Sequence, residues 1–394
     1  MPPSKPVFFK VEFSEMIKSI NEASNIKGKR ILLRLDFNVP IVRGKITDDF
    51  RIQSVIPTIN LLRDAGARVI IVSHIEGKGS STLKPVADYL VEKKIPLTFV
   101  QKFFTVAAGK VLAGMKDGDV VLFENVRLNK GETENNEIFS RKLADMADIF
   151  VNEAFPVSHR AHASIVGVPK LLPSFAGPIF MREVKNLSLA FKPEKPFLFI
   201  LGGAKFDTKM PLIKKFLDLA DFVFVGGALA NNFFKELNLE VGESTISDGN
   251  FNLPELLKTK KVFIPTDVVS VSKGGKGMRK IKTTGRVLDD EKILDVGPQS
   301  LVQLNDLVGK SKFVLWNGPL GNYEEGYSDS TKKLAEIISK ANAKSVVGGG
   351  DTVAAIKTLG LMNKFSFVST GGGAMLDFLA NETLPGIEAL KNSK

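Results

Sequence analysis

Residues 196–227, PFLFILGGAKFDTKMPLIKKFLDLADFVFVGG, contain in one stretch the pattern that decides the fold. The segments 196–201 and 222–225 are apolar on both faces, which is typical of parallel strands buried on both sides of a sheet. Between them, residues 209–219 have the spacing of an amphipathic helix, and each strand ends in paired glycines. A strand, a helix and a second strand in this order predict a doubly wound α/β sheet.

The same alternation runs through the rest of the chain. Further strands are expected at 30–35, 68–73, 97–100, 119–123, 148–152, 262–264, 312–316, 344–347 and 365–369. Further helices are expected at 52–65, 83–94, 104–114, 134–147, 228–237, 329–341, 352–358 and 374–380. The length of 394 residues fits two domains.

We therefore expect an α/β protein with two doubly wound, parallel-sheet (Rossmann-like) domains. The N-terminal domain is expected over residues 1–179 and the C-terminal domain over 193–377. Between them, 169–195 begins rich in proline, continues as a helical stretch and ends in PEKP. A helix flanked by prolines predicts a semi-rigid connector, so we expect a hinge helix at 180–192, with one more surface helix as the alternative.

Composition excludes several classes of protein. A hydrophobic fraction of 44% and a charged fraction of 25% are typical of a globular chain with a sizeable core, not of a disordered one. No apolar run is long enough for a membrane span, and the first residues do not have the pattern of a secretory signal. The chain has no cysteine, which excludes a disulfide framework, a thiolate zinc site and a cysteine nucleophile and fits a cytoplasmic protein.

The charge balance favours anionic ligands. Lys and Arg number 54 against 43 Asp and Glu, which gives a net charge of +11. The positive charge is diffuse, and its densest cluster, 273–282 (KGGKGMRKIK), has no interleaved aromatic residue for base stacking. A small anionic ligand is therefore expected rather than a nucleic acid, and a nucleic-acid binder that uses 273–282 is the alternative.

Glycines follow four expected strands of the second half, at 202–203, 226–227, 348–350 and 371–373, and each group leads into a helix. Ligands of open α/β sheets bind at this edge, where glycine lets backbone N–H groups and helix N-termini approach a phosphate. Neither GxGxxG nor a P-loop occurs. Lys205 and Lys209 follow the first pair four residues apart, which favours an anion site. Asp351 is either a helix cap or a carboxylate for Mg²⁺.

Polar and charged side chains follow the expected strands of the first half. A charged group at the end of a buried strand is costly unless it has a partner, so several that converge predict a pocket of carboxylate or phosphate size. The spacing of the histidines at 159 and 162 does not favour zinc, because no cysteine or acidic pair accompanies them. The residues of this predicted pocket are Arg34, Asp36, Asn38, Arg51, His74, Arg127 and Arg160.

Ten short motifs make the chain resemble the phosphoglycerate kinase family over about residues 18–390. They occur in the family's order: RLDFNVP at 34–40, SH at 73–74, ENVR at 124–127, AF and HRAHAS within 154–164, LGGAK at 201–205, LDVGPQS at 294–300, WNGPLG at 316–321, GGGDT at 348–352, STGGGA at 369–374 and LPGIEAL at 384–390.

The resemblance implies reversible phosphoryl transfer from 1,3-bisphosphoglycerate to MgADP, by direct in-line transfer after hinge-bending domain closure. The N-terminal domain would bind 3-phosphoglycerate or 1,3-bisphosphoglycerate through Asp36, Phe37, Asn38, Arg51, His74, Arg127 and Arg160. The nucleotide contacts would be Gly203, Lys205, Lys209, Gly227, Gly297, Asn317, Glu324, Gly349, Gly350, Asp351 and Thr352. Arg34, Lys205 and the glycines Gly371, Gly372 and Gly373 would be catalytic, and Asp351 would face Mg²⁺.

The resemblance also implies a monomer, and a segment 378–394 that packs on the N-terminal domain. Several positions depart from the family pattern. After His74 the family usually has Leu-Gly-Arg-Pro, whereas this chain has Ile75, Glu76, Gly77 and Lys78, so a substrate-binding arginine is missing. A catalytically impaired nucleotide-binding scaffold with the same fold is therefore the alternative function.

Overall fold

The computed structural model describes residues 17–76, 81–249, 251–272 and 278–393. The chain divides into two compact units. Unit 1 takes the chain up to Lys185 and again from Asn381, and unit 2 is Asn186–Ala380. The domain boundaries that the sequence suggested, at 179, 193 and 378, remain predictions. Gly77 and Lys78, and residues 273–277 of the basic cluster, lie outside the described residues.

Unit 1 is built on a six-stranded parallel sheet in the order β5-β6-β4-β1-β7-β8. Its strands are β1 (Arg30–Arg34), β4 (Arg68–Val72), β5 (Thr98–Val100), β6 (Val120–Phe123), β7 (Ile149–Asn152) and β8 (Ser174–Ala176). Strand order reverses between β1 and β7, so the crevice for a ligand is expected at the carboxyl ends of these two strands. A short hairpin, β2 (Ile41–Val42) and β3 (Lys45–Ile46), lies outside this sheet.

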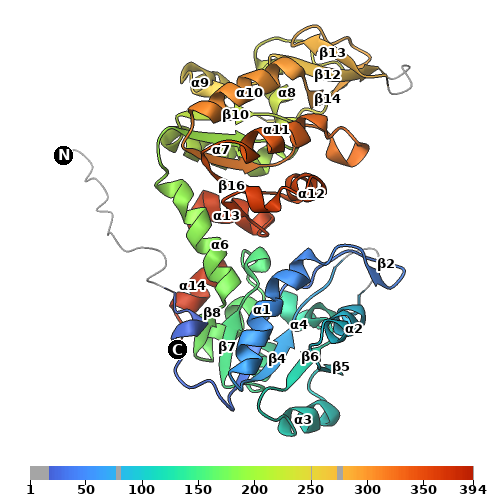
Figure 1. Cartoon of the computed structure of the whole chain (residues 1–394), viewed down its shortest axis with the longest axis vertical. Helices are drawn as coiled ribbons and strands as arrows, with labels where there is room; N and C mark the ends of the chain where they lie inside the picture. The colour runs from blue at the N-terminus through green and yellow to red at the C-terminus, as the bar shows by residue number, and fades with distance from the viewer. Residues whose placement is uncertain (1–16, 77–80, 250, 273–277, 394) are drawn as a thin grey trace, which may run out of the picture. The chain divides into compact units, whose positions relative to one another are not determined.

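The helices of unit 1 cover this sheet (Figure 1). They are α1 (Phe50–Asp64), α2 (Lys84–Glu92), α3 (Val106–Ala113), α4 (Lys130–Thr133), α5 (Glu137–Ala144) and α14 (Pro385–Lys391). Shorter turns of helix are η2 (Ile20–Glu22), η3 (Val126–Leu128), η4 (Phe155–Val157), η5 (Ala163–Gly167) and η6 (Val168–Lys170). The helix α6 (Pro178–Ser188) continues into unit 2 and is followed by η7 (Leu189–Phe191).

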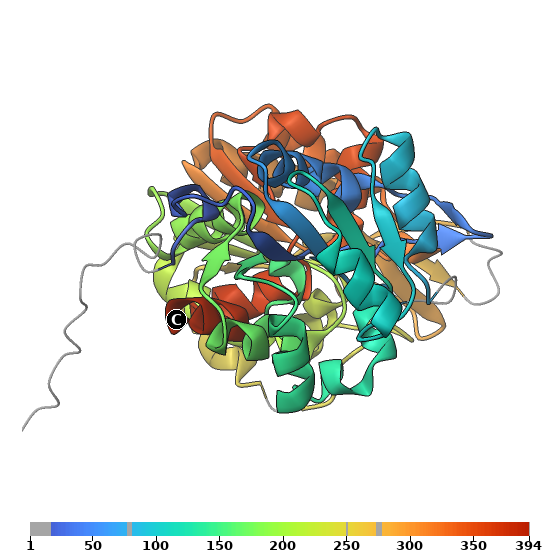
Figure 2. The same cartoon turned by 90° about the horizontal axis from the view of Figure 1, so that it is seen from below.

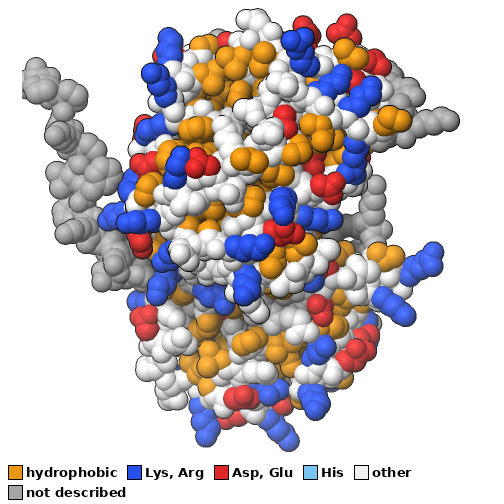
Figure 3. All heavy atoms as spheres, turned by 45° about the horizontal axis from the view of Figure 1, so that its top comes forward, with side chains coloured by type: hydrophobic (Ala, Val, Ile, Leu, Met, Phe, Trp, Pro, Cys, Tyr) orange, Lys and Arg blue, Asp and Glu red, His pale blue; other side chains and the backbone are white. Residues whose placement is uncertain are grey.

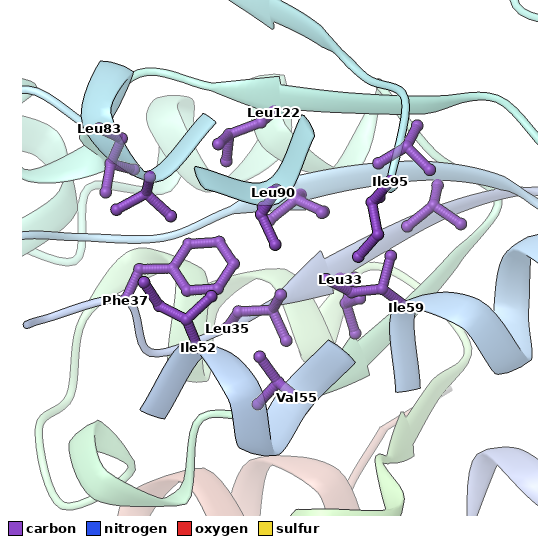
Figure 4. Packing of buried hydrophobic residues seen from close by; sticks show 14 of the residues in the cluster. Leu33, Leu35, Phe37, Ile52, Val55, Ile59, Leu83, Leu90, Ile95 and Leu122 are labelled. Atoms are coloured by element: carbon purple, nitrogen blue, oxygen red, sulfur yellow. The ribbon is translucent and has the colours of Figure 1, made fainter. Parts of the chain in front are cut away.

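The main core of unit 1 lies between the sheet and the helices α1 and α2. Figure 4 shows Leu33 and Leu35 facing Ile52, Val55 and other apolar side chains of this cluster. Burial of such side chains stabilises the fold by about 1.5–3 kcal/mol each. The packing therefore fixes β1 and α1 against each other, and with them the charged residues that follow β1.

Two expectations for unit 1 differ from the structure in their bounds. The helix predicted at 134–147 is shorter in the structure, where α5 spans Glu137–Ala144, because Asn135 has a left-handed φ of 51° and Asn136 is the N-cap of the helix. The Asn136 side chain accepts a hydrogen bond from Phe139 N at 3.0 Å, as an N-cap does. The connector predicted from 169 onward includes β8, which pairs with β7 as the last strand of the sheet.

The C-terminal helix α14 belongs to unit 1. It packs against η5 and β8. Figure 1 shows it beside β8, and Figure 2 marks the C-terminus at its dark red end. Ile387 and Leu390 are buried, and the Gly386 N–H donates to Ser158 O at 2.8 Å. The buried side chains of α14 therefore belong to the core of unit 1.

Unit 2 repeats the architecture with a parallel sheet in the order β11-β10-β9-β15-β16-β17. Its strands are β9 (Phe197–Leu201), β10 (Phe222–Val225), β11 (Val262–Phe263), β15 (Phe313–Asn317), β16 (Lys344–Gly348) and β17 (Phe367–Val368). Its helices are α7 (Phe206–Leu219), α8 (Leu229–Glu236), α9 (Leu253–Lys258), α10 (Pro298–Lys310), α11 (Asp329–Ser339), α12 (Gly350–Thr358) and α13 (Gly373–Asn381), with the short η8 (Tyr323–Glu325) and η9 (Met362–Lys364). Strand order reverses between β9 and β15, which places a ligand crevice at their carboxyl ends.

A second, antiparallel sheet in unit 2 was not expected from the sequence. It consists of β12 (Asp267–Ser272), β13 (Lys280–Thr283) and β14 (Glu291–Val296), which Figure 1 shows together in yellow to orange. The buried Glu291 accepts hydrogen bonds from the Lys280 and Leu288 nitrogens at 3.3 and 3.0 Å. Although burial opposes ionisation, these bonds and Lys282 lower the pKa of Glu291 to about 2.

Within the described residues, no helix has the length and apolar character that crossing a bilayer requires. Over the face that Figure 3 shows, lysine and arginine side chains are dispersed among acidic and apolar ones.

Candidate active site

The first cluster of predicted site residues lies where strand order reverses in unit 1. Arg34 is the last residue of β1, paired in register with Val72 of β4 and Asn152 of β7. Its side chain is fully buried. A buried guanidinium needs compensating partners, because removing a charge from water costs several kcal/mol.

Those partners come from α4 and η5. Arg34 Nε donates to Ser164 Oγ at 2.8 Å, and Ser164 Oγ donates in turn to Glu132 Oε1 at 2.6 Å. Ser164 N donates to the other carboxylate oxygen at 2.8 Å, and Arg34 Nη2 lies 3.9 Å from Glu132 Oε1. Burial lowers the pKa of Arg34 to about 10, with Glu132 and Asp36 opposing the shift, so the guanidinium stays charged at neutral pH. The sequence had given no signal for Glu132.

Two histidines of the cluster, His74 and His162, lie near the arginines and are uncharged at neutral pH. His74 Nδ1 lies 3.3 Å from Arg34 Nη2 and 3.8 Å from Asp36 Oδ1. Burial, followed by the surrounding arginines, lowers the pKa of His74 well below its usual range. The same causes lower the pKa of His162 to about 4. At neutral pH the cluster therefore takes its positive charge from arginine alone.

Arg51 and Asp36 form the side of the cluster nearest α1. Arg51 Nη1 donates to Asp36 Oδ2 at 2.8 Å and to Asn38 O at 3.3 Å, while Asn38 N donates to Asp36 Oδ1 at 3.0 Å. The Asp36 side chain is 5% exposed, so this pair is part of the fold of the loop. Phe37 does not join them: its ring lies in the apolar core (Figure 4), and its N–H donates to Ser73 Oγ at 2.9 Å.

Arg127 and Arg160 complete the arginine cluster. The Arg127 side chain is 6% exposed. Both arginines form ion pairs with Glu76, at 3.7 Å for Arg160 Nη1 and Glu76 Oε2. The structure thus brings together Arg34, Asp36, Asn38, Arg51, His74, Arg127 and Arg160, and their contact with a substrate remains a prediction.

The second set of predicted residues lines a pocket of about 620 Å³ in unit 2. The pocket lies at the carboxyl ends of β9, β10, β15 and β16, in the crevice that the strand order indicates. The predicted nucleotide and catalytic residues that line it are Gly203, Lys205, Lys209, Gly227, Asn317, Glu324, Gly349, Gly350, Asp351, Gly372 and Gly373.

Glycine is required where two loops of the pocket meet. Gly227 has a φ of +62°, and a Cβ on it would lie 2.6 Å from Gly203 N and 2.9 Å from Gly203 O. Neither backbone group can move away without disturbing the turn after β9, since Gly203 N donates to Pro319 O at 2.8 Å. Only glycine lets the turns after β9 and β10 approach this closely.

The pocket holds two lysines with different surroundings. Lys205, at the start of α7, is exposed, whereas Lys209 is 8% exposed and its Nζ donates to Gly202 O. Burial lowers the pKa of Lys209 to about 8, and Asp351 opposes the shift. Burial and Glu324 raise the pKa of Asp351, and Lys209 lowers it. Lys209, Asp351 and Glu324 therefore share one electrostatic environment.

The donor set of the pocket fits Mg²⁺ bound together with a phosphate ligand. In the described part of the chain, no group of three or more histidine or acidic side chains could hold a metal on its own. Mg²⁺ commonly uses one or two protein carboxylates, water and the phosphates of the substrate. Asp351, half-buried in the first turn of α12, supplies one such carboxylate.

Three predicted residues do not line the pocket: Gly297, Thr352 and Gly371. Gly297 caps α10, and its N–H donates to Asp267 O at 2.9 Å. Thr352 is fully buried, and the Gly371 N–H donates to Ser369 Oγ at 3.0 Å. Each is adjacent in the chain to a residue that lines the pocket, namely Val296, Asp351 and Gly372. A direct contact of the three with a ligand remains a prediction.

The sequence analysis missed the apolar wall of the pocket. It comes from α8 and from the unpredicted antiparallel sheet, through residues such as Phe234, Val268 and Ile293. Asp295 of β14 also lines the pocket and accepts hydrogen bonds from Val296 N at 2.9 Å and Ser330 N at 3.2 Å. Burial raises the pKa of Asp295 to about 6. An apolar wall beside a cationic, glycine-lined end is the arrangement expected for a nucleotide.

Comparison with known proteins agrees with the family resemblance that the sequence motifs indicate. A model of the phosphoglycerate kinase family matches residues 20–382. The phosphoglycerate kinase of Thermosipho africanus is 39% identical over 391 residues, covering 94% of this chain and 97% of the relative. That of Borreliella burgdorferi is 39% identical over 394 residues, covering 95% and 100%.

Solved structures agree with these sequence relatives. The phosphoglycerate kinase structure from Coxiella burnetii matches with a TM-score of 0.83 at 36% identity, covering 96% of this chain and 100% of that one. The structure from Pyrococcus horikoshii matches with a TM-score of 0.83 at 28% identity, covering 95% and 99%. The two-sheet α/β fold predicted from the sequence is thereby confirmed.

Proposed function

This chain belongs to the phosphoglycerate kinase family, and from that premise we propose which of its residues perform the reaction. The reaction is reversible phosphoryl transfer between 1,3-bisphosphoglycerate and ADP, which gives 3-phosphoglycerate and ATP in glycolysis. Phosphoryl transfer depends mainly on positioning and on neutralising charge, with little covalent chemistry for the protein. Arginines, lysines and backbone N–H groups are the means by which this chain would supply both.

Unit 1 is proposed to bind the phosphoglycerate. Arg51, Arg127 and Arg160 offer guanidinium groups that match carboxylate and phosphate oxygens, and Asn38 offers an amide beside them. Arg34 is proposed to face the phosphoryl group in transfer. The hydrogen bond from Arg34 to Ser164, and the Glu132 carboxylate that Ser164 contacts, support this role because they fix the guanidinium and favour its charged form.

Unit 2 is proposed to bind the nucleotide, with the base against the apolar wall and the phosphates at the glycine turns. Lys205 and the N-terminus of α13, at Gly371–Gly373, would neutralise the equatorial oxygens of the phosphoryl group. Lys209 would contact the nucleotide phosphates, and Asp351 would hold the Mg²⁺ that accompanies them. When bound, Mg²⁺ neutralises charge on those phosphates.

Transfer requires the two ligands to meet in one space from which water is excluded, because water would hydrolyse the acyl phosphate. We infer that α6, which carries the chain from unit 1 to unit 2, serves as the hinge for that closure. We also expect a monomer in the cytoplasm that does not bind nucleic acid; the dispersed positive charge in Figure 3 supports the last point.

The observation that carries this proposal is Arg34, a fully buried cation at the carboxyl end of β1 in the switch-point crevice. The test is a coupled assay that contains 3-phosphoglycerate, MgATP, glyceraldehyde-phosphate dehydrogenase and NADH. We expect loss of NADH that depends on both substrates and on Mg²⁺. Calorimetric binding of MgATP without any NADH loss would instead indicate a nucleotide-binding scaffold.

A further inference from the structure

Glu76 forms ion pairs with two of the arginines that are proposed to bind the substrate. Its carboxylate pairs with Arg127 and, at 3.7 Å, with Arg160. The Arg127 guanidinium is buried and has no other acidic partner in the described part of the chain. The Glu76 side chain, by contrast, is 50% exposed. A surface carboxylate thus covers a buried cation at the position where an anionic substrate has to arrive.

The other two carboxylates of the arginine cluster are fixed. The Asp36 and Glu132 side chains are 5% and 0% exposed. Asp36 accepts from Arg51 and from the backbone of its own loop, and Glu132 accepts from Ser164 N and Oγ. Removing either from its site would leave several donors unpaired. Three carboxylates pair with these arginines among the described residues. Glu76 is therefore the one that an incoming anion can displace.

The attachment of Glu76 also favours movement of the side chain alone. Its backbone N–H donates to Asn38 Oδ1 at 2.9 Å, which holds the main chain beside the cluster. Rotation of the side chain would carry the carboxylate into water while that bond persists. A negatively charged ligand and Glu76 cannot share one guanidinium without like-charge repulsion, so the ligand has to displace the carboxylate.

We propose that Glu76 is an intramolecular competitor that sets the affinity of unit 1 for 3-phosphoglycerate. This inference rests on the proposed function. In the empty site Glu76 neutralises Arg127, and an anionic group of the substrate takes its place on binding.

The test compares Glu76→Gln with the wild-type protein and with Glu92→Gln, which removes the same charge from an exposed position at the end of α2. Calorimetry without nucleotide measures the Kd for 3-phosphoglycerate. We expect Glu76→Gln to lower that Kd by up to about fivefold, the upper end of the range for losing one partly exposed charge pair. The KM for 3-phosphoglycerate should fall with it, and the Kd for MgATP should not change.

Other outcomes would overturn the inference. A Kd that is unchanged, or that falls equally in Glu92→Gln, would show that Glu76 does not compete. A higher Kd in Glu76→Gln would make Glu76 a positioning residue for the arginines instead. Glu76→Asp, which keeps the charge but shortens its reach, should lower the Kd by less and serves if the glutamine variant does not fold. Binding of MgATP but not of 3-phosphoglycerate by every form would refute the proposed function itself.

Discussion

Glu132→Gln should destabilise unit 1 far more than a surface substitution would. The Glu132 carboxylate is fully buried, accepts two hydrogen bonds from Ser164, and lies 3.9 Å from the buried Arg34. Breaking a buried ion pair by removing one partner costs about 3–5 kcal/mol, because the remaining charge loses its compensation. Asp36 also stabilises the charge on Arg34, so we expect a loss near the lower end, about 3 kcal/mol.

Urea unfolding followed by circular dichroism measures this loss, with Glu134→Gln as the matched control. Glu134 lies two residues away at the end of α4 and is exposed. Its carboxylate Oε1 lies 3.6 Å from Lys130 Nζ. A surface pair of this kind contributes about 0–1 kcal/mol. The single tryptophan, Trp316, lies in unit 2, so its fluorescence reports separately on the unit that is not altered. A shift for Glu132→Gln no larger than that of the control would refute the reasoning.

Three further predictions concern unit 2. Lys205→Ala should lower kcat by roughly 10²–10³, the effect of one transition-state charge donor, in steady-state assays with the melting temperature unchanged; an unaltered kcat would remove Lys205 from that role. Because the folded-state pKa of Asp295 is raised to about 6, its ionisation should reduce stability as pH rises from about 4 to 6, by at most about 1.4 kcal/mol per pH unit. Urea unfolding at several pH values should show this downward contribution in the wild-type protein and not in Asp295→Asn; equal slopes would contradict it. Gly227→Ala should abolish nucleotide binding in calorimetry, because its Cβ would strike the backbone of Gly203, whereas Gly309→Ala, where a Cβ meets nothing within 4 Å, should leave binding intact. Normal binding by Gly227→Ala would show that the turn can rearrange.

Local signals in the sequence were sufficient for most of the parallel sheets. An uninterrupted apolar run, such as 222–225, predicts a strand buried on both faces, and the structure has β10 at those residues. Arg34 could be identified in the same way, since a cation at the end of such a run needs partners. The antiparallel sheet gave no comparable signal, because β13 alternates exposed and half-buried residues and β12 has an irregular register at Val269 and Ser270.

Contacts between distant segments explain what the sequence could not predict in the site. Glu132 lies in a short polar helix, and its burial depends on Ser164, 32 residues further on. Glu76 pairs with Arg127 and Arg160, which reach it from two other segments of unit 1. Phe37 was assigned to the substrate site through its motif, yet its ring belongs to the core. A motif identifies neighbours in the chain, whereas side-chain direction is set by packing.

The two units handle negative charge by different physical means, and mutations should therefore affect them differently. The proposed site of unit 1 consists of guanidinium groups, each paired with a carboxylate, so its binding strength would depend on which carboxylate can leave. The proposed site of unit 2 consists of lysines, glycine turns and helix N-termini, where the backbone itself would approach the ligand. Changing a charge should tune affinity for the phosphoglycerate by degrees, as proposed for Glu76. Adding a Cβ at Gly227 should instead close the nucleotide site altogether, because a backbone contact has no alternative rotamer through which to relieve the clash.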